Sequence, residues 1–526
     1  MSRVGAAVAG RWTALRAANP TWILVVGGLL FAYGSWSFFD SRHPRGQANV
    51  AISGDGRYQW AFVTSLVLDR DLDFANQYDE AGSGNFAGYG RTDTGKYANP
   101  FSIGPALMWS PFFLIGHGVS LLAGNEGAAR GNDELTQQIT LYASFLCAVG
   151  AALLAYVMAR KRWGPGPAFA GAFVGLMCGP VLHYAINQPS FAHAPSAFAV
   201  ALIWYVWDAG RGRRELRGWI GLGACVGLAM LCRAQNLVYA LPVIAEGVWR
   251  LIVAGRAPGD AGQRARAVLR AAAAPALGAA CALLVFLPQM IAWHSIYGYW
   301  LGVPQGHSYM RLSESLWANT LFSSRNGLFP YAPLWAVGML GLVAVTRRDR
   351  VLGAALAATF CVTAFVNGAV VDWWAIGSIG GRRFDGLLVH AALGSAVACA
   401  ALLRAVEKRP RAAAGTLIGA VLLLAAKCNG VQDRDFQNKE RYAEVDHRDM
   451  VAHYNRLLNR GTRRVHDLIG NPLSWPGAIA FHWRTGAPID SYDKVVGPNF
   501  LDGFDRSLGD FQVRRPALER AVLHFG

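Results

Sequence analysis

Long apolar stretches alternate with short polar ones along most of the chain. A helix that crosses a membrane needs about 20 apolar residues. Eleven stretches meet this need, at 21–39, 136–158, 167–186, 192–208, 217–233, 237–254, 271–291, 329–345, 351–370, 386–403 and 411–428. The pattern predicts an all-α, polytopic membrane protein with about eleven transmembrane helices. The composition agrees, because 53% of the residues are hydrophobic, only 16% are charged and the mean hydropathy is +0.25.

The loop charges predict which side of the membrane each segment faces. With a cytoplasmic N-terminus and eleven spans, the basic loops at 160–162, 211–217, 250–270, 347–350 and 404–411 all lie in the cytoplasm, as Lys and Arg prefer. A further apolar run, 101–122, is then expected to lie in the membrane interface, since counting it as a span would put every later basic loop outside. The basic N-terminus precedes an apolar run without a clear cleavage site, so we expect a signal anchor.

This topology divides the chain into two parts. Residues 1–429 form the predicted transmembrane domain, which includes a long first outer loop at 40–135. Residues 430–526 form a polar, basic region outside the cytoplasm, in which 447–469 has the apolar spacing of an amphipathic helix. A small domain or a cap over the outer face is expected there.

Charge and cysteine content exclude other classes. The net charge of +16 does not indicate a nucleic-acid partner, because the basic residues of a membrane protein collect in cytoplasmic loops and contact anionic lipid. The 8 cysteines lie in or beside apolar runs, without CxxC or Cys/His spacing. Disulfides and zinc are therefore not expected.

The first outer loop carries the most informative acid, Asp55. The turn Ser53-Gly54-Asp55-Gly56 opens a short amphipathic helix that contains Tyr58. A carboxylate at a helix N-terminus sees the positive end of the helix dipole, which keeps it ionised. Such a group suits a general base, although an ordinary helix-capping role fits the same pattern. Further along, Asp71 and Asp73 form a DxD that is a candidate site for Mg²⁺ or Mn²⁺, or else a solvated turn.

Five cations fall on the predicted outer side, against the usual charge bias. They are Lys96, Arg233, Arg325, Arg382 and Arg383. Misplaced ionisable groups in membrane proteins are functional candidates, and together these would bind a lipid phosphate. Alternatively, each cation pairs with a local acid such as Asp372 or Asp385. Tyr58, Asp93, His183 and His193 share this side and are candidate substrate contacts, with a structural role the more ordinary one for the histidines.

The chain resembles the GT-C superfamily of polyprenyl-phosphate-dependent glycosyltransferases. The matching motifs are GDGRYQWAFVTSLVLDRDLDFANQY, TGKYANPFSIGPALMWSPFFLIGH, CRAQN, SSRNGLF and WWAIGSIGGRRF. Relatives include protein O-mannosyltransferases, the lipid A aminoarabinose transferase and arabinofuranosyltransferases. The resemblance covers residues 20 to about 430.

The resemblance implies a fold, a site and a location. It implies a GT-C bundle with interfacial juxtamembrane helices in the bacterial cytoplasmic (inner) membrane, with the active site on the periplasmic side. It aligns Asp55 with the catalytic base and makes Lys96, Arg233, Arg325 and Arg383 candidates for the donor phosphate. The implied reaction moves a sugar from a polyprenyl-phosphate donor to a glycan, lipid or protein acceptor with inversion. Relatives with monophosphate donors require no cofactor, whereas those with pyrophosphate donors keep a metal.

Other functions fit parts of the same pattern. A transporter or a flippase for lipid-linked sugars would place polar groups near the bilayer midplane, but the helix interiors here are mostly apolar. A non-catalytic scaffold would use the C-terminal region to bind a partner. A related oligosaccharide polymerase or ligase would use the outer Arg and His residues without an Asp base.

Overall fold

The structure of the protein is a computed structural model. It describes residues 21–40, 52, 54–80, 90–306, 309–323, 326–375, 380–405, 415, 419 and 474–486. Within these residues there is no β-strand, only two isolated bridges, Arg91 with Tyr97 and Met310 with Val370. The predicted segments 411–428 and 447–469 lie almost wholly or wholly outside the described residues, as does Arg325.

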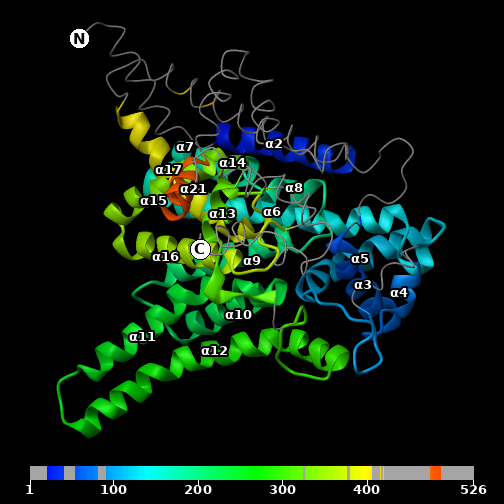
Figure 1. The fold of residues 1–526 in the computed structure, drawn as a ribbon, viewed down its shortest axis with the longest axis horizontal. Helices are drawn as coiled ribbons and strands as arrows, with labels where there is room; N and C mark the ends of the chain where they lie inside the picture. Colours follow the sequence, from blue (N-terminus) through cyan, green and yellow to red (C-terminus); the bar gives the residue numbers. More distant parts are fainter. Residues whose placement is uncertain are drawn as a thin grey trace, which may run out of the picture.

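Helices account for nearly all of the described fold. The longer ones are α2 (Thr21–Asp40), α3 (Asp55–Thr64), α5 (Gly104–Leu122), α6 (Glu134–Trp163), α7 (Pro165–Met177), α9 (His193–Gly210), α10 (Leu216–Cys232), α11 (Leu241–Gly255), α12 (Ala261–Tyr297), α15 (Pro333–Arg348), α16 (Arg350–Gly368), α17 (Leu388–Ala405) and α21 (Trp475–Thr485). The shorter ones are η1 (Ser65–Asp69), α4 (Ala75–Glu80), η3 (Ala128–Arg130), α8 (Val181–Ile186), η4 (Ala234–Ala240), η6 (Leu312–Glu314), α13 (Trp317–Phe322), α14 (Leu328–Tyr331) and η7 (Arg382–Leu387). Figure 1 shows α3, α4 and α5 together at one end of the molecule, and α11 and α12 as a projecting hairpin.

Six of the described helical segments are long and apolar enough to cross a membrane, so the chain is a helical, multi-pass membrane protein. They are Gly104–Leu122, Ala128–Trp163, Ala234–Gly255, Ala261–Tyr297, Arg350–Gly368 and Arg382–Ala405. Segment 101–122 meets the length and apolarity of a span as α5, and its interfacial placement stays a prediction. So do the total of about eleven spans and the orientation of the termini.

Several predicted spans are interrupted or extended in the structure. Segment 167–186 divides into α7 and α8, because Pro180 precedes α8 and cannot continue the α7 hydrogen-bond pattern. Segment 329–345 likewise divides at Ala332, before Pro333. In the other direction, segment 271–291 lengthens into the 37 residues of α12, about 55 Å at 1.5 Å per residue. That length exceeds a hydrocarbon core of about 30 Å, so α12 extends past one surface of the membrane.

Helix α17 belongs to the most buried of the six candidate membrane spans, Arg382–Ala405. Nearly every side chain in its first half is buried, including Leu388, Val389 and Leu393. Close packing explains part of this burial, because a Cβ on Gly394 would lie 1.8 Å from the carbonyl oxygen of Gly338 in α15. Small residues let the backbones of membrane helices approach in this way. The position of α17 fixes that of η7, which leads directly into it.

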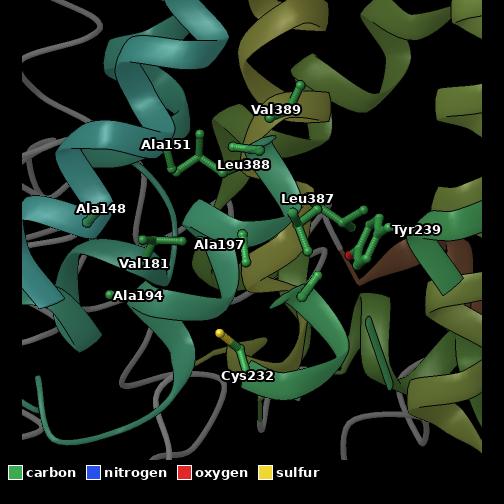
Figure 2. Packing of buried hydrophobic residues seen from close by; sticks show 14 of the residues in the cluster. Ala148, Ala151, Val181, Ala194, Ala197, Cys232, Tyr239, Leu387, Leu388 and Val389 are labelled. Atoms are coloured by element: carbon green, nitrogen blue, oxygen red, sulfur yellow. The ribbon is translucent and has the colours of Figure 1, made fainter. Parts of the chain in front are cut away.

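One apolar core joins the helices that end near η7. Figure 2 shows Ala148 and Ala151 of α6, Val181 of α8 and Ala194 and Ala197 of α9 facing Leu387 to Val389, with Cys232 and Tyr239 alongside. Deleting buried methylene groups from such a core costs about 2–5 kcal/mol for a large-to-small change. This packing holds the start of α9, the end of α10 and all of η7 in fixed relation.

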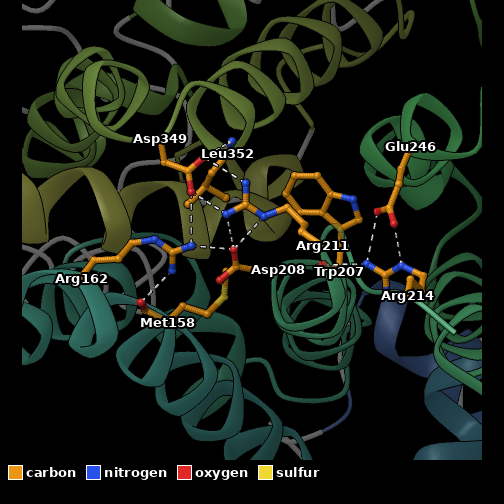
Figure 3. Close-up of polar contacts among 9 residues, drawn as sticks. All are labelled: Met158, Arg162, Trp207, Asp208, Arg211, Arg214, Glu246, Asp349 and Leu352. Atoms are coloured by element: carbon orange, nitrogen blue, oxygen red, sulfur yellow. Dashed lines mark hydrogen bonds and ion pairs between the residues drawn. The ribbon is translucent and has the colours of Figure 1, made fainter. Parts of the chain in front are cut away.

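A second set of contacts joins residues in three of the predicted cytoplasmic loops, at 160–162, 211–217 and 347–350. Figure 3 shows Arg162 of α6 and Arg211, after α9, around the carboxylates of Asp208 and Asp349. Arg162 Nη2 lies 2.6 Å from Asp208 Oδ1, and Arg211 Nη1 donates to Asp349 Oδ1 at 2.9 Å. The hydrogen bond from Arg211 lowers the pKa of Asp349 to about 2. Asp349 also caps α16 through the N–H of Leu352.

Candidate active site

Helix α3 begins at Asp55 and packs its apolar side into the bundle. Gly54 precedes it with φ 48°. Trp60 and Phe62 are buried, so the helix is held firmly against its neighbours. The Asp55 side chain is 35% exposed at the N-terminal end of this helix, where the dipole favours its negative charge. The structure therefore presents an accessible carboxylate on a rigid support.

Arg382 of η7 forms an ion pair with Asp55. The nearest nitrogen of its guanidinium, Nη1, lies 3.1 Å from Asp55 Oδ2, and the Arg382 side chain is only 10% exposed. Its guanidinium also stands over the ring of Phe191, 5.8 Å from the ring centre. Two residues that the sequence suggested separately, as base and as phosphate ligand, are therefore in direct contact. The two residues lie 327 positions apart in the chain (382 − 55), so the sequence gives no local signal of this pairing.

Arg233 belongs to a buried trio with His193 and Asp385. Asp385 Oδ2 lies 2.9 Å from Arg233 Nη1 and 2.8 Å from His193 Nδ1. Asp385 Oδ1 accepts a hydrogen bond from the N–H of Gly386 at 2.6 Å. Since a carboxylate accepts and a guanidinium only donates, Asp385 is the centre of the trio. The trio joins the first residue of α9, the residue after α10, and η7.

Arg383 is held by Asp372. Its guanidinium donates to the Asp372 carboxylate at 2.7 Å and to the Asp372 backbone carbonyl at 2.7 Å. A third contact, at 3.3 Å, is with the hydroxyl of Tyr309. The sequence left open that these cations pair with local acids. The structure contains such pairs, Arg233 with Asp385 and Arg383 with Asp372. Of these acids, Asp385 was considered only as a local partner, because the sequence does not show that α10 ends beside η7.

The charges of Arg233, Arg382 and Arg383 all act on one residue, Tyr309. Burial raises the pKa of the Tyr309 phenol, and Arg383, Arg233 and Arg382 all oppose that shift. Tyr309 is thus within electrostatic reach of each of them. With Asp55, Asp372 and Asp385 as partners, three cations face three anions, so the cluster is electrically balanced when no ligand is bound. We call these six residues the arginine–aspartate cluster.

The turn of residues 92–96 lies against the end of α12, apart from this cluster. Lys96 Nζ donates to Ser295 Oγ at 2.7 Å. Thr94 Oγ1 donates to the carbonyl of Ile296 at 2.7 Å, and Asp93 is exposed at the tip of the turn. No contact between Lys96 and the cluster is present among the described residues.

The remaining candidate substrate contacts, Tyr58, His183 and His193, lie in α3, α8 and at the start of α9. The ring of Tyr58 stacks on Phe101 at 5.1 Å, and burial, followed by the charge of Asp55, raises its pKa. The buried His183 meets the edge of Tyr184 at 4.8 Å. Tyr184 also lies 4.3 Å from the ring of His193. His193 contacts the cluster directly through Asp385, and Tyr184 links His183 to His193.

The DxD forms a local turn. Asp71 Oδ1 accepts from Ser65 Oγ at 2.7 Å and from the N–H of Asp73 at 3.2 Å. Asp73 Oδ1 accepts from the N–H of Ala75 at 3.3 Å. Within the described part of the chain, no three His, Cys, Asp or Glu side chains are arranged to hold a metal ion. In this structure Asp71 and Asp73 act as turn residues, and their role in metal binding stays a prediction.

Comparison with known proteins gives partial sequence matches. No family model matches the chain. The undecaprenyl phosphate-alpha-4-amino-4-deoxy-L-arabinose arabinosyl transferase of Pseudomonas aeruginosa is 34% identical over 165 residues, which is 29% of this chain and 26% of the relative. The enzyme of the same description from Pseudomonas paraeruginosa is 36% identical over 107 residues, 19% of each chain. The alignments thus span about a quarter or less of these curated relatives.

Solved structures with a related arrangement come from an archaeon. The oligosaccharyltransferase of Archaeoglobus fulgidus, bound to an inhibitory peptide and a dolichol-phosphate, aligns with a TM-score of 0.47 and 13% identity over 85% of this chain and 59% of that one. The same enzyme tethered to an acceptor peptide gives a TM-score of 0.48 and 12% identity over 80% and 57%. The aminoarabinose transferases are among the relatives named by the GT-C resemblance, and the sequence matches reach them over part of their length.

Proposed function

We propose that this chain, with its sequence relatives among the aminoarabinose transferases, is an integral-membrane glycosyltransferase of the GT-C type. It moves a sugar from a polyprenyl-phosphate donor to an extracytoplasmic glycan, lipid or protein acceptor. The observation that carries this proposal is the contact between the accessible carboxylate of Asp55 and the buried cation Arg382. A base and a phosphate ligand side by side are what transfer from a phosphate leaving group requires.

The proposed step is an inverting displacement at the anomeric carbon. An acceptor hydroxyl gives its proton to Asp55 as its oxygen forms a bond to that carbon. The bond between the anomeric carbon and the phosphate oxygen breaks, and its electron pair leaves with the lipid phosphate. Arg382, with Arg383 beside it, stabilises the charge that develops on the phosphate oxygen. Preorganised cations of this kind supply much of the rate enhancement in comparable sites.

The donor phosphate also changes the state of Asp55. Without donor, the Arg382 guanidinium holds this carboxylate in an ion pair. A lipid phosphate that takes the guanidinium donors releases Asp55 to accept a proton. Arg233 acts as a positioning residue in this scheme, because Asp385 and His193 hold it in the buried trio. Lys96 and Arg325 remain candidates for the donor phosphate.

The test measures transfer and donor binding separately in proteoliposomes. The first donor to use is undecaprenyl phosphate carrying sugar-labelled 4-amino-4-deoxy-L-arabinose, followed by other polyprenyl-phosphate sugars, with a cell-envelope extract as the acceptor. Asp55→Asn should reduce transfer by about 10²–10⁴-fold while the variant still binds undecaprenyl phosphate. Wild-type turnover by a donor-binding Asp55→Asn variant refutes the mechanism.

Two controls accompany this experiment. Asp73→Asn keeps its turn hydrogen bond, because Asn accepts from a backbone N–H in the same way, so transfer should persist. Transfer should also persist in EDTA, since we assign no metal to Asp71 and Asp73. Label that crosses the bilayer while still attached to the donor lipid would instead identify a flippase.

A further inference from the structure

A polar cavity lies on the side of α3 that faces α4 and the start of α6. Its volume is about 250 Å³. Four amide side chains line it, those of Asn76, Gln77, Asn132 and Gln137. Trp60 and Tyr78 add aromatic surface, and Arg57, Asp69 and Arg130 add charge. None of these residues belongs to the arginine–aspartate cluster.

We infer that this cavity binds a sugar unit of the acceptor that is not the unit receiving the new bond. The inference rests on the proposed glycosyltransferase function and narrows it, because it requires an acceptor that already carries at least one sugar. An acceptor peptide without a glycan would have no group for this cavity.

The amide side chains match the chemistry of a sugar. Each sugar hydroxyl both donates and accepts hydrogen bonds, and so does each Asn or Gln side chain. Gln77 is arranged to offer an acceptor, because its Nε2 donates to Asp69 Oδ2 while its Oε1 is buried without a hydrogen-bond partner among the described residues. Buried polar atoms without partners are uncommon and costly. A ligand hydroxyl bound in the cavity would supply the missing donor.

The aromatic residues give the cavity a rigid wall. Trp60 and Tyr78 are 5% and 6% exposed, so their positions are fixed by packing. The indole Nε1 of Trp60 donates to Asn132 Oδ1 at 3.3 Å, and the Gln137 amide donates to the Asn132 carbonyl at 2.8 Å. These bonds orient two of the lining amides before any ligand arrives. Preorganisation of this kind reduces the entropy lost on binding.

The charges select among ligands. Two cations, Arg57 and Arg130, and one anion, Asp69, line the cavity, which suits a neutral or acidic sugar better than an amino sugar. A lipid chain is a poor ligand, because hydrocarbon would remove water from the amides without replacing its hydrogen bonds. The cavity therefore favours a saccharide over the prenyl part of the donor.

The cavity and the proposed base, Asp55, lie on different faces of α3. Arg57, Trp60, Ala61 and Thr64 line it and share one face of the helix by their spacing. Asp55, two residues before Arg57, points from a different face, because each residue turns an α-helix by about 100°. A sugar in the cavity thus lies beside the helix end that carries Asp55, with its reacting neighbour around that end. Changes in the cavity should affect the acceptor KM much more than kcat.

The test uses the full chain in nanodiscs and saturation-transfer NMR with three probes: methyl β-D-glucopyranoside, methyl β-D-glucuronide and methyl β-D-glucosaminide. We expect saturation transfer to the first two and weaker transfer to the amino sugar. Gln137→Leu should weaken binding about tenfold, as expected for the loss of one buried polar partner. Gln138→Leu is the matched control, since the adjacent Gln138 bonds Glu134 instead and lies outside the cavity. Asn76→Ala, at an exposed position, is a second variant that spares the core.

The outcomes separate this inference from the proposed function. No saturation transfer to any probe, or equal loss in Gln137→Leu and Gln138→Leu, overturns the cavity assignment even when sugar transfer is observed. Conversely, probe binding that depends on Gln137, together with unimpaired transfer by Asp55→Asn, supports the cavity and rejects the catalytic proposal. Asp55→Asn should bind the probes as the wild type does.

Discussion

Replacing Asp55 with asparagine should tighten the binding of the donor phosphate while it reduces transfer by about 10²–10⁴-fold. In the donor-free protein, Asp55 pairs with the guanidinium of Arg382 at 3.1 Å. An incoming donor phosphate must therefore compete with this carboxylate for the guanidinium. Asparagine has nearly the same shape but no charge, so the variant removes the competitor and keeps the packing. If Asp55 only capped α3, its replacement by asparagine would not increase the affinity for phosphate.

The size of the effect follows from the exposure of the pair. Two unit charges at this distance attract by about 5 kcal/mol at an effective dielectric constant of about 20, but solvation of the separated charges offsets most of that. Exposed pairs contribute about 0.2–1 kcal/mol, and breaking a buried pair costs about 3–5 kcal/mol. With one partner 35% and the other 10% exposed, about 1–2 kcal/mol is expected, which is about five- to thirtyfold in affinity.

The assay is titration of the purified protein in nanodiscs with undecaprenyl phosphate, followed by native mass spectrometry. Asp73→Asn is the charge-matched control and should bind as the wild type does. The difference between Asp55→Asn and the wild type should shrink with added salt, because the pair is partly exposed to solvent. Unchanged or weaker binding by Asp55→Asn would refute the competition between Asp55 and phosphate for Arg382.

Two further predictions concern the ion pairs that support the fold. In a double-mutant cycle, Arg233→Gln and Asp385→Asn should each destabilise the protein by about 3–5 kcal/mol, and the double variant should fall short of their sum by about 0.5–3 kcal/mol. Thermal unfolding in one detergent measures this, and additive effects would show that the two side chains are not coupled. Asp349→Asn should cost about 1 kcal/mol at neutral pH, and because the folded-state pKa is depressed to about 2, this difference should vanish as the pH falls from about 4 toward 2. Asp260→Asn, which keeps a helix-capping side chain, controls for the substitution itself at neutral pH, and a difference for Asp349→Asn that persists at low pH would contradict the assignment.

The sequence predicted where individual helices lie better than it predicted where helices break and which helices contact one another. Apolar length located α6, α10 and α16 closely, because a membrane helix satisfies its own backbone and must be apolar along its length. The breaks at Pro180 and Ala332 were missed, since the apolar run continues through them. Periodicity alone does not distinguish one long helix from two short ones in a buried segment.

The site shows the same division between local and long-range information. Asp55 was identified from its place at a helix start, and Arg233, Arg382 and Arg383 from charge on the unexpected side of the membrane. Asp385 was not identified as the centre of a trio, because its partners come from two other helices. The cavity beside α3 was also missed. Its four amide side chains lie between residues 76 and 137 and are common surface residue types, so only the fold brings them together.

Burial and bonding within the arginine–aspartate cluster assign different roles to its three acids. Asp385 is 2% exposed and bonds two side chains and a backbone N–H, so its release would leave the half-buried Arg233 guanidinium without its carboxylate partner, at a cost in free energy. Asp372 is more exposed but holds Arg383 through both its carboxylate and its carbonyl. Asp55 is the most exposed of the three, and its described ion pair with Arg382 is a single contact. An incoming phosphate should therefore displace Asp55 first, and the acid that is displaced first is the one then free to accept a proton.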